Sequence, residues 1–221
     1  MLEINNISFA YGKSRSKKSI VENFSLHASP GECVVLAGPN GTGKSTVLSI
    51  AAGILKPDTG SVTARGRIAY VPQGSALPED MTVDECLRFF AALNKCALPS
   101  SLPFSVSEIG RQRISTLSGG MKKQVSIACA TLSDPPIILL DEPCAALDMV
   151  FRDEMIRTVA EWKRQNKAIV YVGHDPAEFY RFFDTVVFLG KNVRSHKRSD
   201  LAHETSDGDS FASFYRSEIT K

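Results

Sequence analysis

The stretch CVVLAGPNGTGKST, residues 33–46, decides the fold class. Its first five residues form a continuous apolar run, as strands do when helices cover both faces of a sheet. A glycine-rich segment follows this run. Beyond that segment, apolar side chains recur at helical spacing, at Val47, Ile50, Ala51 and Ile54. A strand, a loop and a helix in this order open a parallel α/β unit.

The loop itself, residues 38–45, fits the pattern G-x-x-x-x-G-K-[ST]. Phosphate groups concentrate negative charge, so their site needs many inward N–H donors, and glycine lets the backbone curl tightly around an anion. In this pattern Lys44 reaches the β- and γ-phosphates of a nucleotide, and Ser45 offers its hydroxyl to Mg²⁺. We therefore predict a site for ATP and Mg²⁺ whose loop residues are Gly38, Pro39, Asn40, Gly41, Thr42, Gly43, Lys44, Ser45 and Thr46.

A second apolar strand, residues 137–140, ends in two adjacent carboxylates, Asp141 and Glu142. Open α/β sheets hold their ligands at the carboxyl edge of the strands, so Asp141 is expected at that edge. There Asp141 can bind Mg²⁺ through water, and Glu142 can orient or deprotonate an attacking water. Following a phosphate loop, this strand predicts the catalytic half of a nucleotide site.

Two segments depart from the α/β pattern. In the first, Ile20, Phe24 and Leu26 nearly alternate with polar residues, which predicts a half-buried strand. The second, residues 74–117, predicts a small helical lobe inserted in the core. Within it, Thr82-Val-Asp-Glu85 has the form of a capping box, which satisfies free amides at a helix start. The apolar stripe of that helix would run along Val83, Leu87, Phe90 and, less regularly, Leu93.

The α/β pattern then resumes toward the C-terminus. A helix is predicted from about Ser118, with one apolar face formed by Met121, Val125, Ala128 and Leu132. A later helix buries Met155, Ile156, Val159 and Trp162. Residues 168–172 predict a third buried strand, residues 185–194 a terminal hairpin, and residues 200–209 a surface link to a final short helix.

Length and composition favour a single domain, residues 1–221, in which residues 1–73 and 118–221 form the nucleotide-binding core with a β subdomain. The formal charge of +2 gives no argument for nucleic acid as a partner. No apolar stretch approaches the length that crosses a bilayer, and the N-terminus lacks the pattern of a secretion signal, so we expect a cytosolic chain. Reduced and mostly buried thiols are expected at Cys33, Cys86, Cys96, Cys129 and Cys144, because their number is odd and their spacing wide.

Residues 117–121, Leu-Ser-Gly-Gly-Met, resemble the signature sequence of ABC ATPases, which is usually Leu-Ser-Gly-Gly-Gln. They lie upstream of the acidic strand, as in that family, and the other family landmarks follow in order over nearly the whole chain. The resemblance implies that Tyr11 stacks on adenine and that Gln73 links Mg²⁺ to the membrane-facing lobe. It further implies that His174 is the switch histidine near the γ-phosphate, and that Asp148 belongs to a loop that meets the opposite subunit.

The resemblance also implies a fold and a mechanism. The fold would be a P-loop NTPase (RecA-like) core with an N-terminal antiparallel β subdomain and an inserted small α-helical subdomain. Two such domains would meet head to tail, and each ATP would lie between the phosphate loop of one and the signature residues of the other, Ser118, Gly119 and Gly120. The partners implied are a second ATPase subunit and an integral membrane permease, which would hold the chain at the inner face of the cell membrane.

Two features depart from the family pattern. Met121 replaces the usual glutamine, so any hydrogen bond from that side chain is absent. The Ser118 hydroxyl and the glycine amides remain, and a helix start with free amides is itself an anion site, so we expect activity to survive. The helical lobe is also shorter than is usual in the family, which weakens any transfer of membrane-partner contacts.

Other functions compete with that of a transporter ATPase. A soluble ABC-type ATPase of an assembly system, such as iron–sulfur cluster assembly, would share every motif and differ only in its partner. DNA-repair relatives carry long coiled-coil insertions, and translation-factor relatives carry two cassettes. A small-molecule P-loop kinase would not explain the signature or His174. A binding module without catalysis is disfavoured because Lys44, Asp141, Glu142 and His174 are all present.

Overall fold

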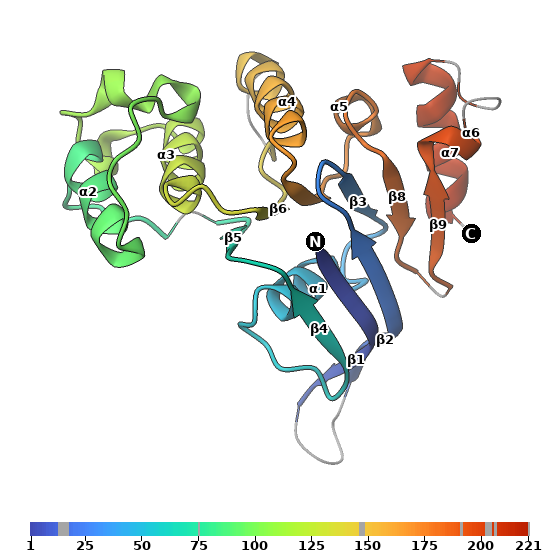
Figure 1. The fold of residues 1–221 in the computed structure, drawn as a ribbon. Helices are drawn as coiled ribbons and strands as arrows, with labels where there is room; N and C mark the ends of the chain where they lie inside the picture. The colour runs from blue at the N-terminus through green and yellow to red at the C-terminus, as the bar shows by residue number, and fades with distance from the viewer. Residues whose placement is uncertain are drawn as a thin grey trace.

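The described part of the chain forms two β-sheets with helices around them (Figure 1). In the computed structural model, the described residues are 1–12, 18–74, 76–145, 149–190, 192–201, 205 and 207–220. The smaller sheet lies beside one face of the larger one, and a group of short helices stands at the edge of the larger sheet. This is the mixed α/β fold that the sequence predicts.

The smaller sheet is antiparallel, with the strand order β2-β1-β4. Its strands are β1 (Leu2–Tyr11), β2 (Lys18–Ala28) and β4 (Thr59–Ala64). Along β2, Val21, Phe24 and Leu26 are buried while their polar neighbours are exposed, because only one face of this sheet packs on the core. The predicted N-terminal β subdomain is therefore present.

The larger sheet has the strand order β5-β6-β7-β3-β8-β9. Its strands are β3 (Cys33–Ala37), β5 (Ile68–Val71), β6 (Ile137–Asp141), β7 (Ala168–Val172), β8 (Thr185–Phe188) and β9 (Arg194–Lys197). All neighbouring pairs are parallel except β8 and β9, which form the predicted hairpin. Since the parallel strands point the same way, their carboxyl ends share one edge, where residues from β3, β6 and β7 come together.

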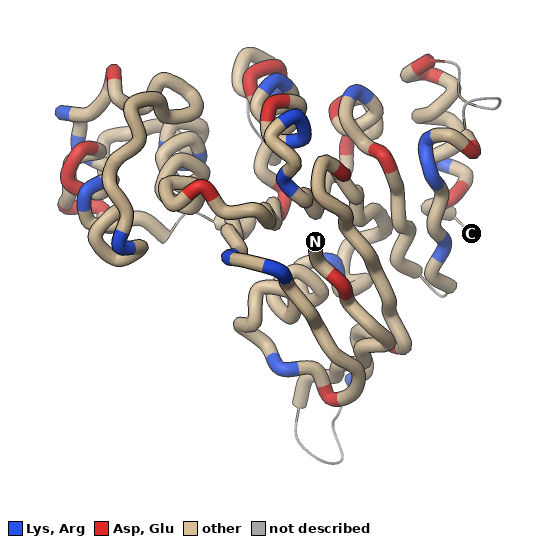
Figure 2. The backbone as a smooth tube through the Cα atoms, viewed as in Figure 1, with Lys and Arg blue, Asp and Glu red and all other residues tan. Residues whose placement is uncertain are grey.

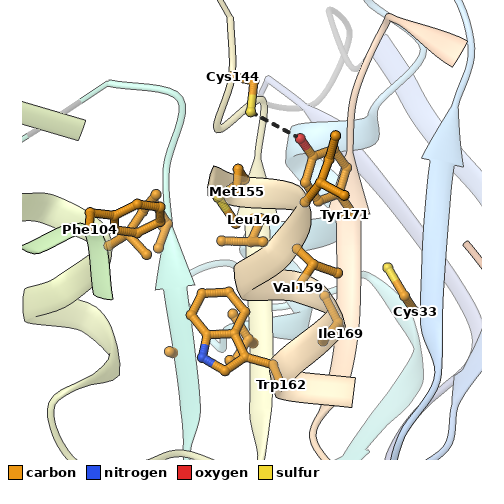
Figure 3. Close-up of a cluster of buried hydrophobic side chains, with 14 of the residues drawn as sticks. Cys33, Phe104, Leu140, Cys144, Met155, Val159, Trp162, Ile169 and Tyr171 are labelled. Carbon is orange, nitrogen blue, oxygen red and sulfur yellow. Dashed lines mark hydrogen bonds between the residues drawn. The ribbon is translucent and has the colours of Figure 1, made fainter. Parts of the chain in front are cut away.

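Helices cover both faces of this sheet. On one face, α1 (Lys44–Ala51) packs with the antiparallel sheet. The other face carries α4 (Met149–Arg164), α5 (Pro176–Phe179) and α7 (Gly208–Thr220), and α6 (Arg198–Leu201) follows β9. Figure 3 shows Met155, Val159 and Trp162 of α4 packed over Leu140 and Ile169 of the sheet. This two-sided cover explains why β3, β6 and β7 are apolar without alternation.

The helical lobe consists of α2 (Val83–Asn94) and the 3₁₀ segments η2 (Pro103–Ile109) and η3 (Ile114–Thr116), and α2 and η2 pack against α3 (Gly119–Thr131), the helix that follows them. The capping box is formed: the Glu85 amide donates to Thr82 Oγ1, and the Thr82 amide donates to the Glu85 carboxylate. All five cysteines are free thiols, and only Cys96 is not fully buried, as expected. Within the described ranges, no helix has both the length and the apolar character to cross a membrane.

Two predicted apolar positions are exposed. Ile54 is 64% exposed and lies after α1, which ends because Gly53 adopts a left-handed conformation and the Ile54 amide turns back to the Ser49 carbonyl. Leu93 is 62% exposed in the last turn of α2, about 90° around the helix from the centre of the buried set. That set is Val83, Cys86, Leu87 and Ala91. The final helix, α7, has 13 residues and is longer than the short helix predicted there.

Candidate nucleotide-binding site

The loop between β3 and α1 depends on glycine at two places. Gly38 has φ 140°, and a Cβ there would lie 2.3 Å from the Leu189 carbonyl oxygen. Gly43 has φ 97° and precedes α1, whose first amides receive no side-chain cap. Unsatisfied amides at a helix start, together with the positive end of the helix dipole, attract an anion. The loop is thus shaped and polarised for phosphate.

Lys44 is the cation of this loop, and its side chain is only 5% exposed. Its Nζ donates to the Gly38 carbonyl at 2.8 Å and to the Pro39 carbonyl at 2.9 Å. Burial lowers the pKa of Lys44, and the nearby carboxylates of Glu142 and Asp141 oppose that shift. The ammonium is therefore anchored inside the loop, at the point where a phosphate chain would pass.

Asp141, the last residue of β6, is buried and accepts a hydrogen bond from Ser45 Oγ at 3.2 Å. Burial raises the pKa of Asp141, while the Ser45 hydroxyl and the ammonium groups of Lys123 and Lys44 act in the opposite direction. A hydroxyl and a carboxylate this close offer two hard oxygen ligands beside the phosphate loop. Such ligands suit Mg²⁺, which is usually held by one or two protein oxygens, by water and by substrate phosphates.

Glu142 connects the ends of three strands. Its Oε2 accepts from Gln73 Nε2 at 2.9 Å, and its Oε1 lies 2.8 Å from His174 Nε2. An ionised carboxylate can only accept, so Nε2 of His174 carries the proton in that state. The backbone of Glu142 is left-handed, with φ 47°, and its amide donates to the Val172 carbonyl. The turn after β6 thereby aims this carboxylate along the carboxyl edge of the sheet.

These side chains surround a cavity of about 530 Å³. Its lining comprises Tyr11, Ile20, Asn40, Gly41, Gly43, Lys44, Ser45, Thr46, Gln73, Glu142 and His174. Sequence reasoning named every one of these residues as part of the site except Ile20, which it assigned only to a strand. Ile20 contributes through its position on β2, where its Cγ2 would lie 3.0 Å from a Cβ at Gly43. Gly38, Pro39 and Thr42 belong to the loop without lining the cavity, and Asp141 reaches it through Ser45.

Tyr11 ends β1 at the rim of this cavity and is 49% exposed. Its ring meets the Phe9 ring edge-on, with centroids 4.9 Å apart and an interplanar angle of 87°. The hydroxyl lies 3.5 Å from Thr46 Oγ1, at the limit of a hydrogen bond. Phe9 thus supports the ring from one side while a large part of it stays open to a ligand.

The signature residues lie apart from the cavity. Ser118 caps α3, its Oγ accepting from the Met121 amide at 3.2 Å, and both Ser118 and Gly119 are exposed. Within the described part of the chain, none of Ser118, Gly119 and Gly120 lines the cavity. Met121 contributes its backbone amide to the cap, which any residue other than proline could supply. Asp148, expected in a loop at the opposite subunit, falls outside the described residues.

Lys123 is a second residue near the site that sequence reasoning missed. Its Nζ donates to the carbonyls of Pro72 and Gln73, at 2.7 and 2.8 Å. Nothing in the sequence distinguishes it from its neighbour Lys122, which pairs with Glu79 at the surface. Helical periodicity gives no signal either, because Lys123 lies about half a turn around α3 from the predicted apolar face.

Comparison with known proteins shows which family this chain resembles. Residues 21–145 match the sequence model of the family described as ABC transporter. The Nod factor export ATP-binding protein I of Paraburkholderia xenovorans (strain LB400) is 36% identical over 182 residues, covering 73% of this chain and 60% of that protein. The linearmycin resistance ATP-binding protein LnrL of Bacillus subtilis (strain 168) is 31% identical, covering 91% of this chain and 70% of that protein. The chain therefore spans 60–70% of the length of these two relatives.

Solved structures agree with the sequence matches. A structure of an ATP-binding subunit of an ABC transporter superimposes with a TM-score of 0.85 at 26% identity, covering 100% of this chain and 99% of the other. A dimeric bacterial ABC transporter cassette gives a TM-score of 0.77 at 25% identity, covering 89% of this chain and 98% of the other. Because the family match spans more than half of the sequence and a relative above 30% identity covers most of it, the chain belongs to the ABC transporter family, and within it to the ATP-binding proteins.

Proposed function

We propose that this chain is the ATP-hydrolysing subunit of an ABC transporter. The observation that carries the proposal is the cavity itself, where Lys44 lies opposite a carboxylate held by Gln73 and His174. The phosphate chain of ATP lies along the loop amides and Lys44, and adenine stacks on Tyr11. Glu142 accepts a proton from water, the water oxygen bonds to the γ-phosphorus, and the bond from that phosphorus to the ADP oxygen breaks.

Gln73 and His174 prepare Glu142 for this step. Each donates one hydrogen bond to a different carboxylate oxygen, so the carboxylate cannot rotate freely. Holding a base in one orientation removes part of the entropic cost of reaching the transition state. His174 also lines the same cavity as the phosphate loop, so its Nε2–H can contact the γ-phosphate of bound ATP.

The site suits ATP complexed with Mg²⁺. Ser45 and Asp141 supply the hard oxygen atoms, and Gln73 adds an amide oxygen at the cavity wall. When bound there, Mg²⁺ would neutralise charge that develops on the β- and γ-phosphates. Among the described residues, no group of three or more histidine, cysteine or acidic side chains could hold a metal by itself. A cation in this cavity would therefore be held jointly by the protein and by the phosphates.

The partners follow from where the signature lies. Ser118 caps a helix outside the cavity of its own chain, so it can reach a γ-phosphate only at the cavity of another subunit. The dimeric cassette that resembles this chain supports such a pair. A membrane permease would complete the transporter and hold the chain at the inner face of the cell membrane. The export named for the Nod factor relative favours outward transport.

Two measurements test the proposal. Purified chain should release phosphate from ATP with Mg²⁺ and should stop when EDTA is added. From detergent-solubilised membranes of the native cells, it should co-purify with an integral membrane protein. The similar proteins give no support to a soluble assembly ATPase, but co-purification with a soluble scaffold alone would favour that alternative. A chain that binds ATP and never releases phosphate would contradict the enzymatic role.

Tyr11 variants test the adenine contact. Replacement by alanine is expected to weaken ATP binding by about 1–3 kcal/mol, the usual value for a base stacked on an aromatic ring. Phenylalanine and tryptophan should keep the affinity, because the hydroxyl makes only the marginal 3.5 Å contact with Thr46. Equilibrium titration with a fluorescent ATP analogue measures the difference. Equal losses for alanine and phenylalanine would show that the hydroxyl, rather than the ring, makes the contact.

A further inference from the structure

Lys123 is an unusually placed lysine. Lysine is almost never fully buried unless it is paired, yet this side chain is only 7% exposed in the first half of α3. Its ammonium donates to two consecutive backbone carbonyls, those of Pro72 at 2.7 Å and Gln73 at 2.8 Å. Both distances fit strong charge-assisted hydrogen bonds. The chain thus uses a buried cation to hold a loop that is 50 residues away in sequence.

The loop that Lys123 holds contains Gln73, which contacts the proposed base, Glu142. Gln73 gives its carbonyl to Lys123 and its side-chain amide to Glu142 Oε2, at 2.9 Å. Its side chain is therefore aimed from a backbone position that Lys123 fixes. Lys123 also lies close to the signature: it follows Ser118, the residue that caps α3, by five residues. One short stretch of helix thus joins the signature serine to the loop that orients the base.

The same contacts bridge two parts of the protein. α3 packs against α2 and η2 of the helical lobe, while Gln73 follows β5 at the edge of the larger sheet. If α3 shifts when Ser118 meets a nucleotide, the Lys123 ammonium moves with the helix and takes the Gln73 backbone along. Coupling of this kind needs a contiguous physical connection between the two places, which these hydrogen bonds supply.

We propose that Lys123 is a positioning residue that couples the signature end of α3 to the Gln73 loop and so sets the orientation of Glu142. The inference rests on the proposed ATPase function and names one way in which that site is regulated. Lys123 itself touches neither nucleotide nor water in this scheme. It acts through the Gln73 backbone, and its loss should slow hydrolysis without removing the phosphate site.

Three single variants test the role. Lys123→Met keeps most of the apolar stem and removes the donors, and a misplaced base is expected to lower kcat about tenfold to a hundredfold. The Kd for ATP should stay within about twofold, since Lys44 and Tyr11 are untouched. Lys123→Arg restores donors to the same place and should recover most of kcat. Lys122→Met is the matched control: it removes only the surface pair with Glu79 and should leave kcat unchanged.

A double-mutant cycle separates positioning from general support of the fold. If Lys123 acts through Gln73, the double variant Gln73→Ala with Lys123→Met should be no slower than Gln73→Ala alone. A merely structural role would make the two losses multiply, and would lower the unfolding midpoint and ATP affinity together. If Lys123→Met does not fold, the cycle is repeated with Lys123→Gln, whose shorter, uncharged side chain loses the charge-assisted bonds to both carbonyls and so carries the same expectations.

The outcomes are distinguishable from failure of the proposed function. A wild-type chain that neither binds nor hydrolyses ATP would refute the function before any variant is compared. A wild-type chain that hydrolyses ATP, with an unchanged kcat for Lys123→Met, would overturn only the coupling by Lys123. Multiplicative losses in the cycle, or arginine failing to restore kcat while the protein stays folded, would overturn it as well.

Discussion

A Glu142→Gln protein is expected to bind ATP normally and to hydrolyse it at least about a hundredfold more slowly, the usual contribution of a general base. The amide keeps the shape of the carboxylate but cannot accept a proton from water. Single-turnover measurements of phosphate release, with ATP binding measured separately, give the two quantities. Hydrolysis at the wild-type rate would show that another group is the base.

The geometry allows Glu142→Gln to remove the proton acceptor while both hydrogen-bond contacts of the side chain are kept. Glu142 receives Gln73 Nε2 on one oxygen and meets His174 Nε2 with the other. In the variant, the remaining oxygen can accept from Gln73, and the new amide can donate to His174 once its proton lies on Nδ1. Both contacts therefore survive, and a slower reaction would report the lost proton acceptor.

The same variant should also change the oligomeric state. ATP that is bound and not hydrolysed should hold the cavity of one chain against Ser118 of another. Size exclusion should then show a dimer with ATP and a monomer without it. Adding Ser118→Arg should abolish the dimer, because a bulky side chain would occupy the place of the opposing γ-phosphate. If the isolated chain dimerises too weakly, ATP trapping is compared in the complex with its membrane partner. If the complex traps ATP equally well with and without Ser118→Arg, the signature residues are not part of the ATP site.

Lys44→Ala should weaken ATP binding more than any other single change in the cavity. The ammonium lies inside the loop, bonded to the Gly38 and Pro39 carbonyls, so its removal takes the loop's cation away from the β- and γ-phosphates. Loss of one partner from a buried charge pair costs about 2–5 kcal/mol, which is more than about thirtyfold in Kd. Equilibrium binding of labelled ATP measures the loss.

A matched lysine provides the control for this experiment. Lys122→Ala removes an equal charge from the surface, where it pairs with Glu79, and should leave the Kd unchanged. Arg152 and Arg181 likewise pair with acidic residues along α4 and α5, where both signs of charge are interspersed (Figure 2). Unchanged affinity in Lys44→Ala would mean that the loop does not bind phosphate.

Local patterns were sufficient to predict much of the site. Gly38 and Gly43 could be recognised because phosphate cradles need backbone conformations that other residues rarely adopt, and both are left-handed here. Asp141 and Glu142 could be placed because the four apolar residues 137–140, with no alternation, predict a central strand whose end lies at the ligand edge. In each case the physical requirement lies within about a dozen consecutive residues.

What the sequence did not predict depends on distant contacts. Strand β4 has an almost wholly exposed sequence, Thr59–Ala64, so no alternation marks it, and only its pairing with β1 makes it a strand. Lys122 and Lys123 are identical neighbours, and only the position of the Gln73 loop decides which of them is buried. The same applies to Ile20, whose place at the cavity depends on how the two sheets meet.

The left-handed backbone of Glu142 sets a limit on engineering this protein. A side chain held at φ 47° costs about 1–3 kcal/mol, which asparagine or glycine would largely relieve. A screen for thermostable variants would therefore select substitutions of Glu142. The selected proteins would be more stable but would no longer hydrolyse ATP. Stability and catalytic turnover place opposite demands on the backbone of Glu142. Stabilising substitutions are therefore better sought on the exposed strand β4 or at the surface of α2.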